Sequence, residues 1–288
     1  MSGTETPVIA RLLNTARYPL TQPGSVAWRH TVSHARAALR GGGCCVLSDF
    51  IAPELVDTLR AQSAAMAPAA HYRVETVNAY NIALDTPLPA EHPGRVRMQR
   101  GNAFVPRDKI PAGAVIQRLY TEPVFQRFVA DCFELAQVHE LADPLASLCL
   151  NVVPPGESHP WHFDVNELTV SMLTQAGEGG IFEYCPNIRS ADAENFDDVR
   201  AVLDDRGEHL VHRLSLRPGD LQLFRGRYAL HRVTPVRGTV ARHTAILAYT
   251  QHPGVVSSLE RTRQLFGRVT PEHRAAIRRT VRADRLLD

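Results

Sequence analysis

The sequence predicts an α+β fold whose core is a double-stranded β-helix (jelly roll) flanked by N- and C-terminal helices. From residue 145 onward the chain is a series of short β-rich runs separated by glycine and proline turns. This pattern is typical of sandwiches, barrels and jelly rolls. Before and after these runs, apolar residues recur at helical spacing. Because the chain has no internal repeat and no low-complexity linker, we expect one domain over residues 1–288.

The N-terminal half is expected to supply mainly helices. A helix from Ser25 to Arg40 is stopped by three successive glycines, which favour helix termination. After a short strand, Pro53 opens a second helix at a position where proline is tolerated. We expect a lead-in over 1–24, helical support over 25–140 with strands at 44–50 and 71–84, a proline-rich loop over 85–94, and helices over 53–67 and 122–138.

Seven β-rich runs make up the predicted jelly roll, which spans residues 145–251. Turns such as "PPGES", "GEGG" and "RPGD" separate them. An acidic stretch over 191–205 interrupts the series and is expected to form a short helix or a long surface loop, and residues 252–288 are expected to be helical. The runs lie at 145–153, 167–174, 180–184, 209–216, 220–224, 229–236 and 243–250.

The composition is that of a soluble globular protein, with 44% hydrophobic and 22% charged residues. A net charge of +2 gives no reason to expect nucleic-acid binding, and no apolar run approaches the roughly 20 residues that span a bilayer. The N-terminus lacks the apolar core of a signal peptide. Five cysteines without a CxxC pair indicate buried, reduced thiols, so we expect a cytoplasmic protein.

The stretch "HPWHFD" carries two candidate metal ligands. Side chains two positions apart on an extended segment point to the same face, so His162 and Asp164 could bind one ion. A third ligand could come from a distant strand, and His231 follows a turn and a short apolar strand. Two imidazoles and one carboxylate form the facial triad of non-haem Fe(II) oxygenases. HxD alone is a weak motif, and a lone histidine is more often a structural residue than a ligand.

An iron site that activates oxygen also needs electrons. A bound 2-oxoacid can supply them by oxidative decarboxylation while it chelates the metal through two open positions. Its distal carboxylate needs a forked cation, and Arg242 with Thr244 alternates correctly to provide one. If the triad were absent, a surface salt bridge would be the better explanation of Arg242.

Residues 145–255 resemble the Fe(II)/2-oxoglutarate-dependent enzymes grouped with the free-amino-acid radical halogenases. The resemblance rests on "HPWHFDVNELTVSMLTQAGEGGIFEYCPNIRS", "AENFDDVRAVL" and "LRPGDLQLFRGRYALHRVTPVRG". It implies a double-stranded β-helix, Fe(II), 2-oxoglutarate and O2, and a cosubstrate role for Arg242. The group acts on lysine and similar small amino acids and includes hydroxylases as well as halogenases.

Position 164 separates the two chemistries of this group. The halogenases carry a glycine there, which leaves a coordination site for chloride, whereas this chain has Asp164. The resemblance therefore implies a hydroxylase. It also implies that His159, three positions before the first ligand, lies near the open coordination sites or the substrate; packing on Trp161 is the alternative.

The substrate contacts are less specific. Where lysine-acting relatives have an asparagine on the strand of the cosubstrate arginine, this chain offers Ile246 and Ala248, which weakens the case for lysine itself. Candidates for a substrate carboxylate are Arg95, Arg97 and Arg100, of which the first two would share a face if extended. Candidates for a cationic group are Glu183, Asp192 and Glu194. All of these could equally be surface or structural residues.

We therefore expect a dioxygenase that hydroxylates an unactivated C–H bond of a small polar substrate, in the first place a free cationic amino acid. The same chemistry on a nucleotide, a carrier-tethered acyl group or another amine metabolite is an alternative. A metal-binding jelly roll without catalysis and a protein hydroxylase are further alternatives. We expect no nucleic-acid or membrane partner, a homodimer is an option, and residues 87–94 are a candidate lid.

Overall fold

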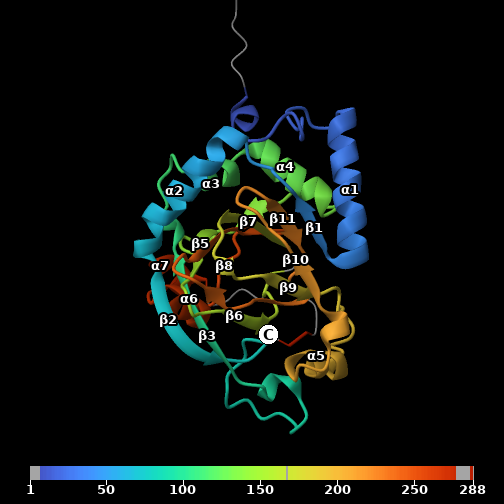
Figure 1. The fold of residues 1–288 in the computed structure, drawn as a ribbon, viewed down its shortest axis with the longest axis vertical. Coiled ribbons are helices and arrows are strands. Elements are labelled where there is room, and N and C mark those ends of the chain that lie inside the picture. Colours follow the sequence, from blue (N-terminus) through green and yellow to red (C-terminus); the bar gives the residue numbers. More distant parts are fainter. Residues whose placement is uncertain (1–6, 167, 277–285, 288) are drawn as a thin grey trace, which may run out of the picture.

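The computed structural model describes residues 7–166, 168–276 and 286–287, and its core consists of two antiparallel β-sheets (Figure 1). The larger sheet has seven strands in the order β1-β11-β7-β14-β5-β3-β2, and the smaller has four in the order β10-β9-β12-β6. Two short pairs, β13 with β8 and β15 with β4, complete the strands. The strands are β1 (Cys44–Leu47), β2 (His71–Val77), β3 (Met98–Val105), β4 (His139–Glu140), β5 (Leu148–Val153), β6 (His159–His162), β7 (Thr169–Gln175), β8 (Glu178–Gly179), β9 (Phe182–Cys185), β10 (His212–Leu214), β11 (Leu221–Phe224), β12 (Leu230–Val233), β13 (Val236–Arg237), β14 (Arg242–Leu247) and β15 (Tyr249–Thr250).

The two sheets face each other, as a jelly roll requires. At one end Phe224 of β11 packs edge-on against Phe182 of β9, with ring centroids 5.4 Å apart. At the other end Phe104 of β3 lies 6.5 Å from the ring of His159 on β6. The space between the sheets is therefore lined by alternate side chains of both. This arrangement confirms the predicted fold class.

Helices cover the outer face of the larger sheet (Figure 1). On β14, Ala245 and Leu247 join the main hydrophobic core beneath these helices. The intervening Arg242, Thr244 and Ile246 alternate to the inner face. The α-helices are α1 (Val26–Gly42), α2 (Val56–Met66), α3 (Val115–Tyr120), α4 (Pro123–Cys132), α5 (Phe196–Leu203), α6 (Leu259–Phe266) and α7 (Pro271–Ala275). Helices α1 to α4 contribute Val32, Leu39, Leu59, Ile116, Phe125 and Phe128 to the core.

The helix boundaries follow local capping chemistry. The Ser25 side chain accepts a hydrogen bond from the Trp28 amide at 3.2 Å and so begins α1. The helix ends at Gly42 rather than at Arg40, because the left-handed turn that terminates it falls on Gly43, with φ of 69°. Helix α4 ends at Cys132, earlier than the predicted 138. Glu134 has a φ of 61°, which the helix cannot continue through.

Residues 25–140 contribute more strand than expected. Strands β1 and β2 begin where predicted but end at Leu47 and Val77, before the predicted 50 and 84, and β3 and the short helix α3 were not predicted. Strand β3 contains Arg100, Gly101 and Asn102, residue types that give little strand signal. It forms because β2 pairs along its whole length on one side and β5 pairs on the other. Packing context overrides the local preference here.

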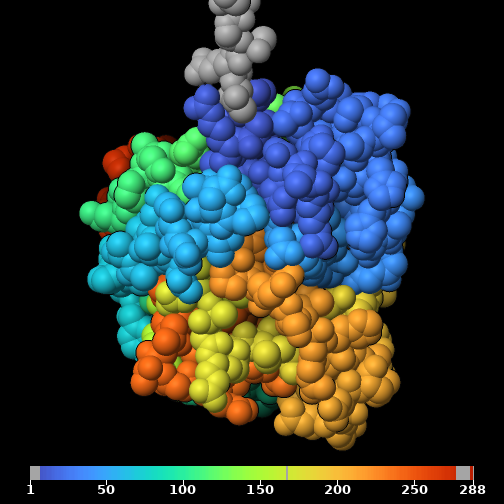
Figure 2. Space-filling view, turned by 45° about the horizontal axis from the view of Figure 1, so that its top comes forward, coloured from blue at the N-terminus to red at the C-terminus, as the bar shows by residue number. Residues whose placement is uncertain are grey.

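The remaining expectations concern the acidic stretch, the tail and the cysteines. The acidic stretch contains α5, which forms a shoulder at the end of the molecule opposite the N-terminal helices (Figure 2). Helices α6 and α7 lie in the predicted helical tail, but residues 252–258 and 267–270 form no helix. The predictions for 1–6, 277–285 and 288 fall outside the described residues. All five cysteines are free and buried. No described helix is long and apolar enough to cross a membrane.

Candidate metal centre

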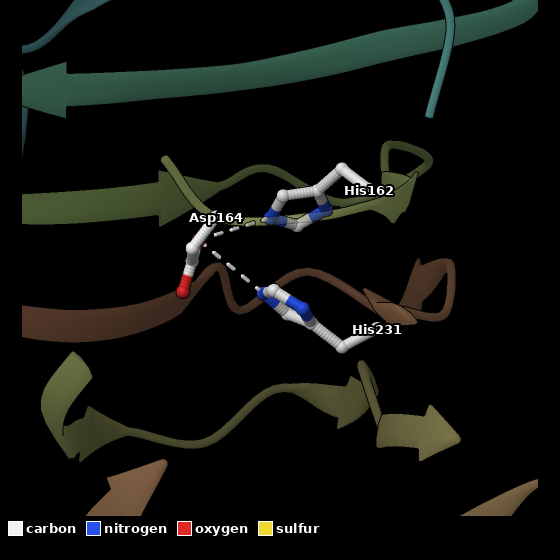
Figure 3. A group of neighbouring side chains, drawn as sticks. All are labelled: His162, Asp164 and His231. Carbon is white, nitrogen blue, oxygen red and sulfur yellow. Dashed lines mark ion pairs between the residues drawn. The ribbon is translucent and has the colours of Figure 1, made fainter. Parts of the chain in front are cut away.

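Three predicted ligands converge between the sheets (Figure 3). His162 ends β6, Asp164 follows two residues later, and His231 lies on β12 directly opposite His162 in the strand register. The Oδ1 atom of Asp164 is 3.8 Å from Nε2 of His162 and 3.6 Å from Nε2 of His231. One ligand atom from each residue lies within 4.8 Å of the others, so the three could hold one ion.

Backbone carbonyls orient both imidazoles for metal binding. Nδ1 of His162 donates to the Pro160 carbonyl at 2.8 Å, and Nδ1 of His231 donates to the Ala229 carbonyl at 3.0 Å. Each contact places the ring proton on Nδ1 and leaves the lone pair of Nε2 available. The donor set of two neutral imidazoles and one carboxylate, with both rings fixed, fits a divalent first-row metal such as Fe(II).

The Asp164 carboxylate is held by its surroundings. Oδ2 accepts a hydrogen bond from the Thr169 hydroxyl at 2.6 Å, and the Asp164 amide donates to the Gly226 carbonyl at 3.1 Å. A Cβ atom on Gly226 would lie only 1.9 Å from Oδ2, so a side chain at 226 would displace the carboxylate. Burial alone would raise the pKa of Asp164, but the neighbouring His231 and His162 rings outweigh it and hold that pKa below its ordinary value.

His159 stacks on the first ligand of the triad. Its ring lies 3.9 Å from that of His162, centroid to centroid, at an interplanar angle of 14°. Burial and nearby positive charges, Arg100 first among them, hold the pKa of His159 well below its ordinary value. Burial and the neighbouring histidines do the same to the pKa of His162. Both imidazoles are therefore neutral at pH 7, as metal binding by His162 requires.

Arg242 is buried on the inner face without an acidic partner. Its side chain is 4% exposed, and Nη1 donates to the Thr244 hydroxyl. No carboxylate among the described residues pairs with it. Burial lowers its pKa to about 10, so the guanidinium still carries its charge at pH 7. A buried cation of this kind is costly unless an anion completes the site, and the distal carboxylate of a 2-oxoacid is such an anion.

The structure does not bring Arg95 and Arg97 to the triad. The segment is not extended as expected: Arg95 ends a 3-10 turn at 93–95, and both side chains are exposed. Arg95 donates to the Leu88 carbonyl at 3.0 Å, and Arg97 donates to the Leu84 carbonyl. The two arginines therefore brace the proline-rich loop.

Arg100 and its strand neighbours do face the triad. Strand β3 alternates Arg100, Asn102 and Phe104 on the face that looks onto His159. Arg100 is 4% exposed and pairs with Glu75 of β2, whose other oxygen is 3.0 Å from Nε of Arg73. The Nη1 atom of Arg100 and both amide atoms of Asn102 are buried without a hydrogen-bond partner.

The predicted carboxylates for a cationic substrate lie elsewhere. Glu183 is buried between Arg213 and Arg232, at 2.8 and 2.7 Å, on the opposite face of β9 from Phe182. Glu194 binds Arg189 at 3.1 Å, and Asp192 is exposed. The structure thus gives no support to a substrate role for these three residues.

Sequence reasoning missed three residues that shape this site. Gly226 gives space to the Asp164 carboxylate. Asn81 donates from Nδ2 to the carbonyl of Phe163, which lies between the ligands His162 and Asp164, at 3.2 Å. Arg261 of α6 donates to Oδ1 of Asn81 at 3.2 Å. None belongs to a local motif, and only the fold brings them together. Arg261 is one of several arginines in the tail, and nothing in the sequence sets it apart from the others.

Comparisons with known proteins agree with this geometry. A model of the halogenase D family matches residues 28–266. A search of curated proteins found no match. Among solved structures, AviO1 from Streptomyces viridochromogenes Tue57 is 16% identical, over 77% of this chain and 96% of that one, with a TM-score of 0.52. A 2OG-Fe(II) oxygenase family protein from Burkholderia pseudomallei is 16% identical, over 80% and 93%, with a TM-score of 0.50. The non-heme alpha ketoglutarate dependent epimerase SnoN, from nogalamycin biosynthesis, is 13% identical, over 77% and 83%, with a TM-score of 0.50.

Proposed function

Because the chain belongs to the halogenase D family, we propose that it hydroxylates an unactivated C–H bond of a small polar substrate, in the first place a free amino acid. The protein is a 2-oxoglutarate-dependent oxygenase that uses Fe(II), 2-oxoglutarate and O2. In the proposed reaction one oxygen atom of O2 enters the substrate C–H bond as hydroxyl. The other enters succinate, and 2-oxoglutarate loses CO2. Oxidation of the cosubstrate thus supplies the two electrons that the monooxygenation needs.

The position of the Asp164 carboxylate carries the assignment to hydroxylation. We assign His162, Asp164 and His231 as the three protein ligands of Fe(II). With a carboxylate at 164, and with Thr169 and Gly226 fixing its direction, no ligand site is left for chloride at this position. When bound, iron together with O2 and 2-oxoglutarate supplies the oxidant for the C–H bond. The protein's own part is to hold the ligands and to orient both small molecules.

Arg242 and Thr244 are assigned to 2-oxoglutarate. Two residues apart on β14, they share the inner face and already contact each other. The guanidinium offers a forked set of donors to a carboxylate, and the Thr244 hydroxyl adds one more. Neutralising a buried, unpaired cation is the interaction that favours a dianionic cosubstrate here.

His159 is assigned to the open side of the centre. Its ring covers one face of His162, and neither ring nitrogen has a hydrogen-bond partner among the described residues. A neutral imidazole in that place can donate one hydrogen bond and accept another. We expect it to contact the substrate or the cosubstrate rather than the metal.

Anaerobic titration of the apoprotein with Fe(II) and then 2-oxoglutarate tests this function. A metal-to-ligand charge-transfer absorption in the visible is expected when the cosubstrate chelates the iron. Arg242→Met should require more 2-oxoglutarate for the same band, whereas Asp164→Ala should fail to form it. Folded wild-type protein that gives no band would exclude the chelate.

A product assay distinguishes hydroxylation from halogenation. With chloride or bromide present, the wild type is expected to add one oxygen atom to its substrate and no halogen, as judged by mass spectrometry. Asp164→Gly is the informative comparison, because it vacates the position that the carboxylate occupies. A halogenated product from the wild type would overturn the hydroxylase assignment.

A further inference from the structure

Helix α6 presents an arginine to the metal-binding segment. Arg261 lies in its first turn, and Ser258 caps the helix by accepting from the Arg261 amide at 3.1 Å. Nη1 of Arg261 donates to Oδ1 of Asn81 at 3.2 Å and to Oε1 of Gln264 at 2.8 Å. Through Asn81, it is joined to the carbonyl of Phe163. Since Phe163 separates two of the triad residues, Arg261 lies beside the centre although it is distant in sequence.

The loop that holds Asn81 is built for this contact. The amide side chain of Asn78 accepts from the backbone amides of Tyr80 and Ile82, at 3.1 and 3.3 Å, and donates to the Ile82 carbonyl at 2.9 Å. Asn81 adopts a left-handed backbone with φ of 57°, which asparagine tolerates better than most residues. The Asn81 side chain is thereby fixed between the ligand segment and α6, and it aims the Arg261 guanidinium.

The charge of Arg261 is not compensated by the protein. Its Nε and Nη2 atoms form no hydrogen bond, and it pairs with no carboxylate, within the part of the chain that the structure describes. Among the described residues, two acidic groups raise the pKa of Arg261: Asp164, which belongs to the triad, and Glu75, which Arg100 and Arg73 already share. Burial lowers the pKa of Arg261 to about 10, and the guanidinium remains charged at pH 7.

Strand β3, which packs against α6, carries polar atoms without hydrogen-bond partners. Nη1 of Arg100 and the whole side-chain amide of Asn102 are buried without a partner, on the strand that packs against α6. Phe104, on the same face of β3, lies 6.5 Å from the ring of His159 and 6.3 Å from the ring of Phe266 of α6, so this face of β3 meets both the centre and α6. Since Arg242 is assigned to the cosubstrate, these donors remain for a second anion.

We propose that Arg261, supported by Arg100 and Asn102, binds an anionic group of the substrate, and that the substrate is a small carboxylic acid without a cationic side chain. This inference rests on the proposed function. It replaces the expectation of a cationic amino acid, since Glu75 is already shared by Arg100 and Arg73 and Asp164 is a metal ligand, so neither is free to receive an ammonium or guanidinium group. Helix α6 then determines which substrates are accepted.

The test uses the full-length protein with Fe(II) and 2-oxoglutarate under anaerobic conditions. Three sets of probes are added: aspartate and glutamate, leucine and glutamine, and lysine and arginine. Each amino acid of the last two sets is paired with the amine that lacks its α-carboxylate and so carries no anionic group. An acidic or neutral amino acid is expected to shift the charge-transfer band. The cationic amino acids and all of the decarboxylated amines are expected to leave it unchanged.

Variants of α6 test whether Arg261 binds the acid that shifts the charge-transfer band. Arg261→Gln should weaken binding of the effective acid on the order of 10- to 100-fold, with unchanged affinity for Fe(II) and 2-oxoglutarate, because a charge-assisted pair is lost. Arg263→Gln is the matched control, since it removes an exposed guanidinium from the same helix. Arg261→Lys, which keeps the charge but not the fork, should lose less than Arg261→Gln.

The outcomes separate the two levels of the proposal. If the wild type forms no band with Fe(II) and 2-oxoglutarate, the proposed function fails. If the band forms but lysine or a decarboxylated amine shifts it as well as any acid does, the function stands and the anion site is wrong. The same conclusion follows if Arg261→Gln or, should that variant not fold, Arg261→Lys binds the acid as tightly as Arg263→Gln does.

Discussion

Two arginines on the outer side of the smaller sheet, behind the metal centre, have a carboxylate partner. Two on the inner side, in front of the centre, have none within the described part of the chain. On the outer side of the smaller sheet, Glu183 is 4% exposed and receives both Arg213 and Arg232. On the inner side, Arg242 and Arg261 have no carboxylate partner among the described residues. Arg242 is 4% exposed and Arg261 is half-buried, but only the outer side supplies its own counter-charge. Because an unpaired buried charge destabilises the folded chain, its presence indicates a place where a ligand supplies the counter-charge.

The presence or absence of a carboxylate partner therefore separates arginines that stabilise the fold from arginines that bind a ligand. A paired arginine behind the centre should matter for folding and little for turnover. An unpaired arginine in front should matter for ligand binding and little for folding. Each prediction below changes one side of this comparison and measures both stability and activity.

Removal of a triad side chain should have the largest effect. His162→Ala or His231→Ala takes away a ligand whose other ring nitrogen is already fixed by a backbone carbonyl. Changes in groups that only orient a ligand typically cost 10- to 100-fold in metal affinity or activity, so loss of the ligand itself should cost more than about 100-fold. Product formation and bound iron should fall together, and a purified variant with normal turnover would remove that residue from the ligand set.

Arg242→Met comes second and tests the inner side directly. The apparent affinity for 2-oxoglutarate should fall on the order of 100-fold, because a forked ion pair in a water-poor site is lost. The substrate requirement should change far less. Removing an unpaired cation should also leave the melting temperature unchanged or raise it.

Arg213→Met is the matched control for that experiment. It removes a guanidinium of the same size from the outer side, where it pairs with Glu183. Here the melting temperature is expected to fall while the requirement for 2-oxoglutarate stays as in the wild type. If both variants raised the requirement equally, the distinction between the two sides would be lost.

Gly226→Ala should have a smaller effect on the same centre. The new methyl group would overlap Oδ2 of Asp164 and turn the carboxylate away from its contact with Thr169. Iron affinity should fall about 10- to 100-fold, as for other changes that misdirect a ligand. Equilibrium iron binding measures this, and Gly113→Ala, at a position with open space around it and no left-handed backbone, controls for handling of the variant. Unchanged iron affinity would mean that the carboxylate tolerates the displacement.

The sequence was informative where the chemistry is local or periodic. His162 and Asp164 stand two apart, and Arg242 and Thr244 alternate on one strand, so a period of two predicted their shared faces. The β-rich runs likewise predicted the jelly roll, because glycine and proline turns mark their ends. For these features, neighbouring residues alone carry the information.

The features that the sequence did not reveal depend on distant partners. Strand β3 holds Arg100 inside the molecule because β2 and β5 pair with it, although its central residues Arg100, Gly101 and Asn102 give little strand signal. Arg261 reaches the centre through Asn81, 180 positions away along the chain. The structure places the candidates Arg95, Arg97 and Glu183 away from the triad for the complementary reason. Each finds a backbone carbonyl or an ion pair nearby, and nothing in the local sequence reveals this.

Glu183→Gln should have the smallest effect on activity. It tests the outer side of the comparison through the pH dependence of stability. Burial would raise the pKa of Glu183, but Arg213 and Arg232 outweigh it and hold that pKa below its ordinary value near 4.5. A lowered pKa in the folded state means that the carboxylate stabilises the protein above its unfolded pKa, and that this stabilisation is lost as the pH falls through the folded value.

At pH 7, Glu183→Gln should therefore lower the free energy of unfolding by about 1–3 kcal/mol, since both arginines can partly regain water. The deficit relative to the wild type should shrink between pH 4.5 and the folded pKa, while the affinity for 2-oxoglutarate stays unchanged throughout. Urea titrations at pH 7 and near pH 3.5 measure this difference in the free energy of unfolding. A difference that is the same at both pH values would show that packing, rather than charge, holds Glu183 in place.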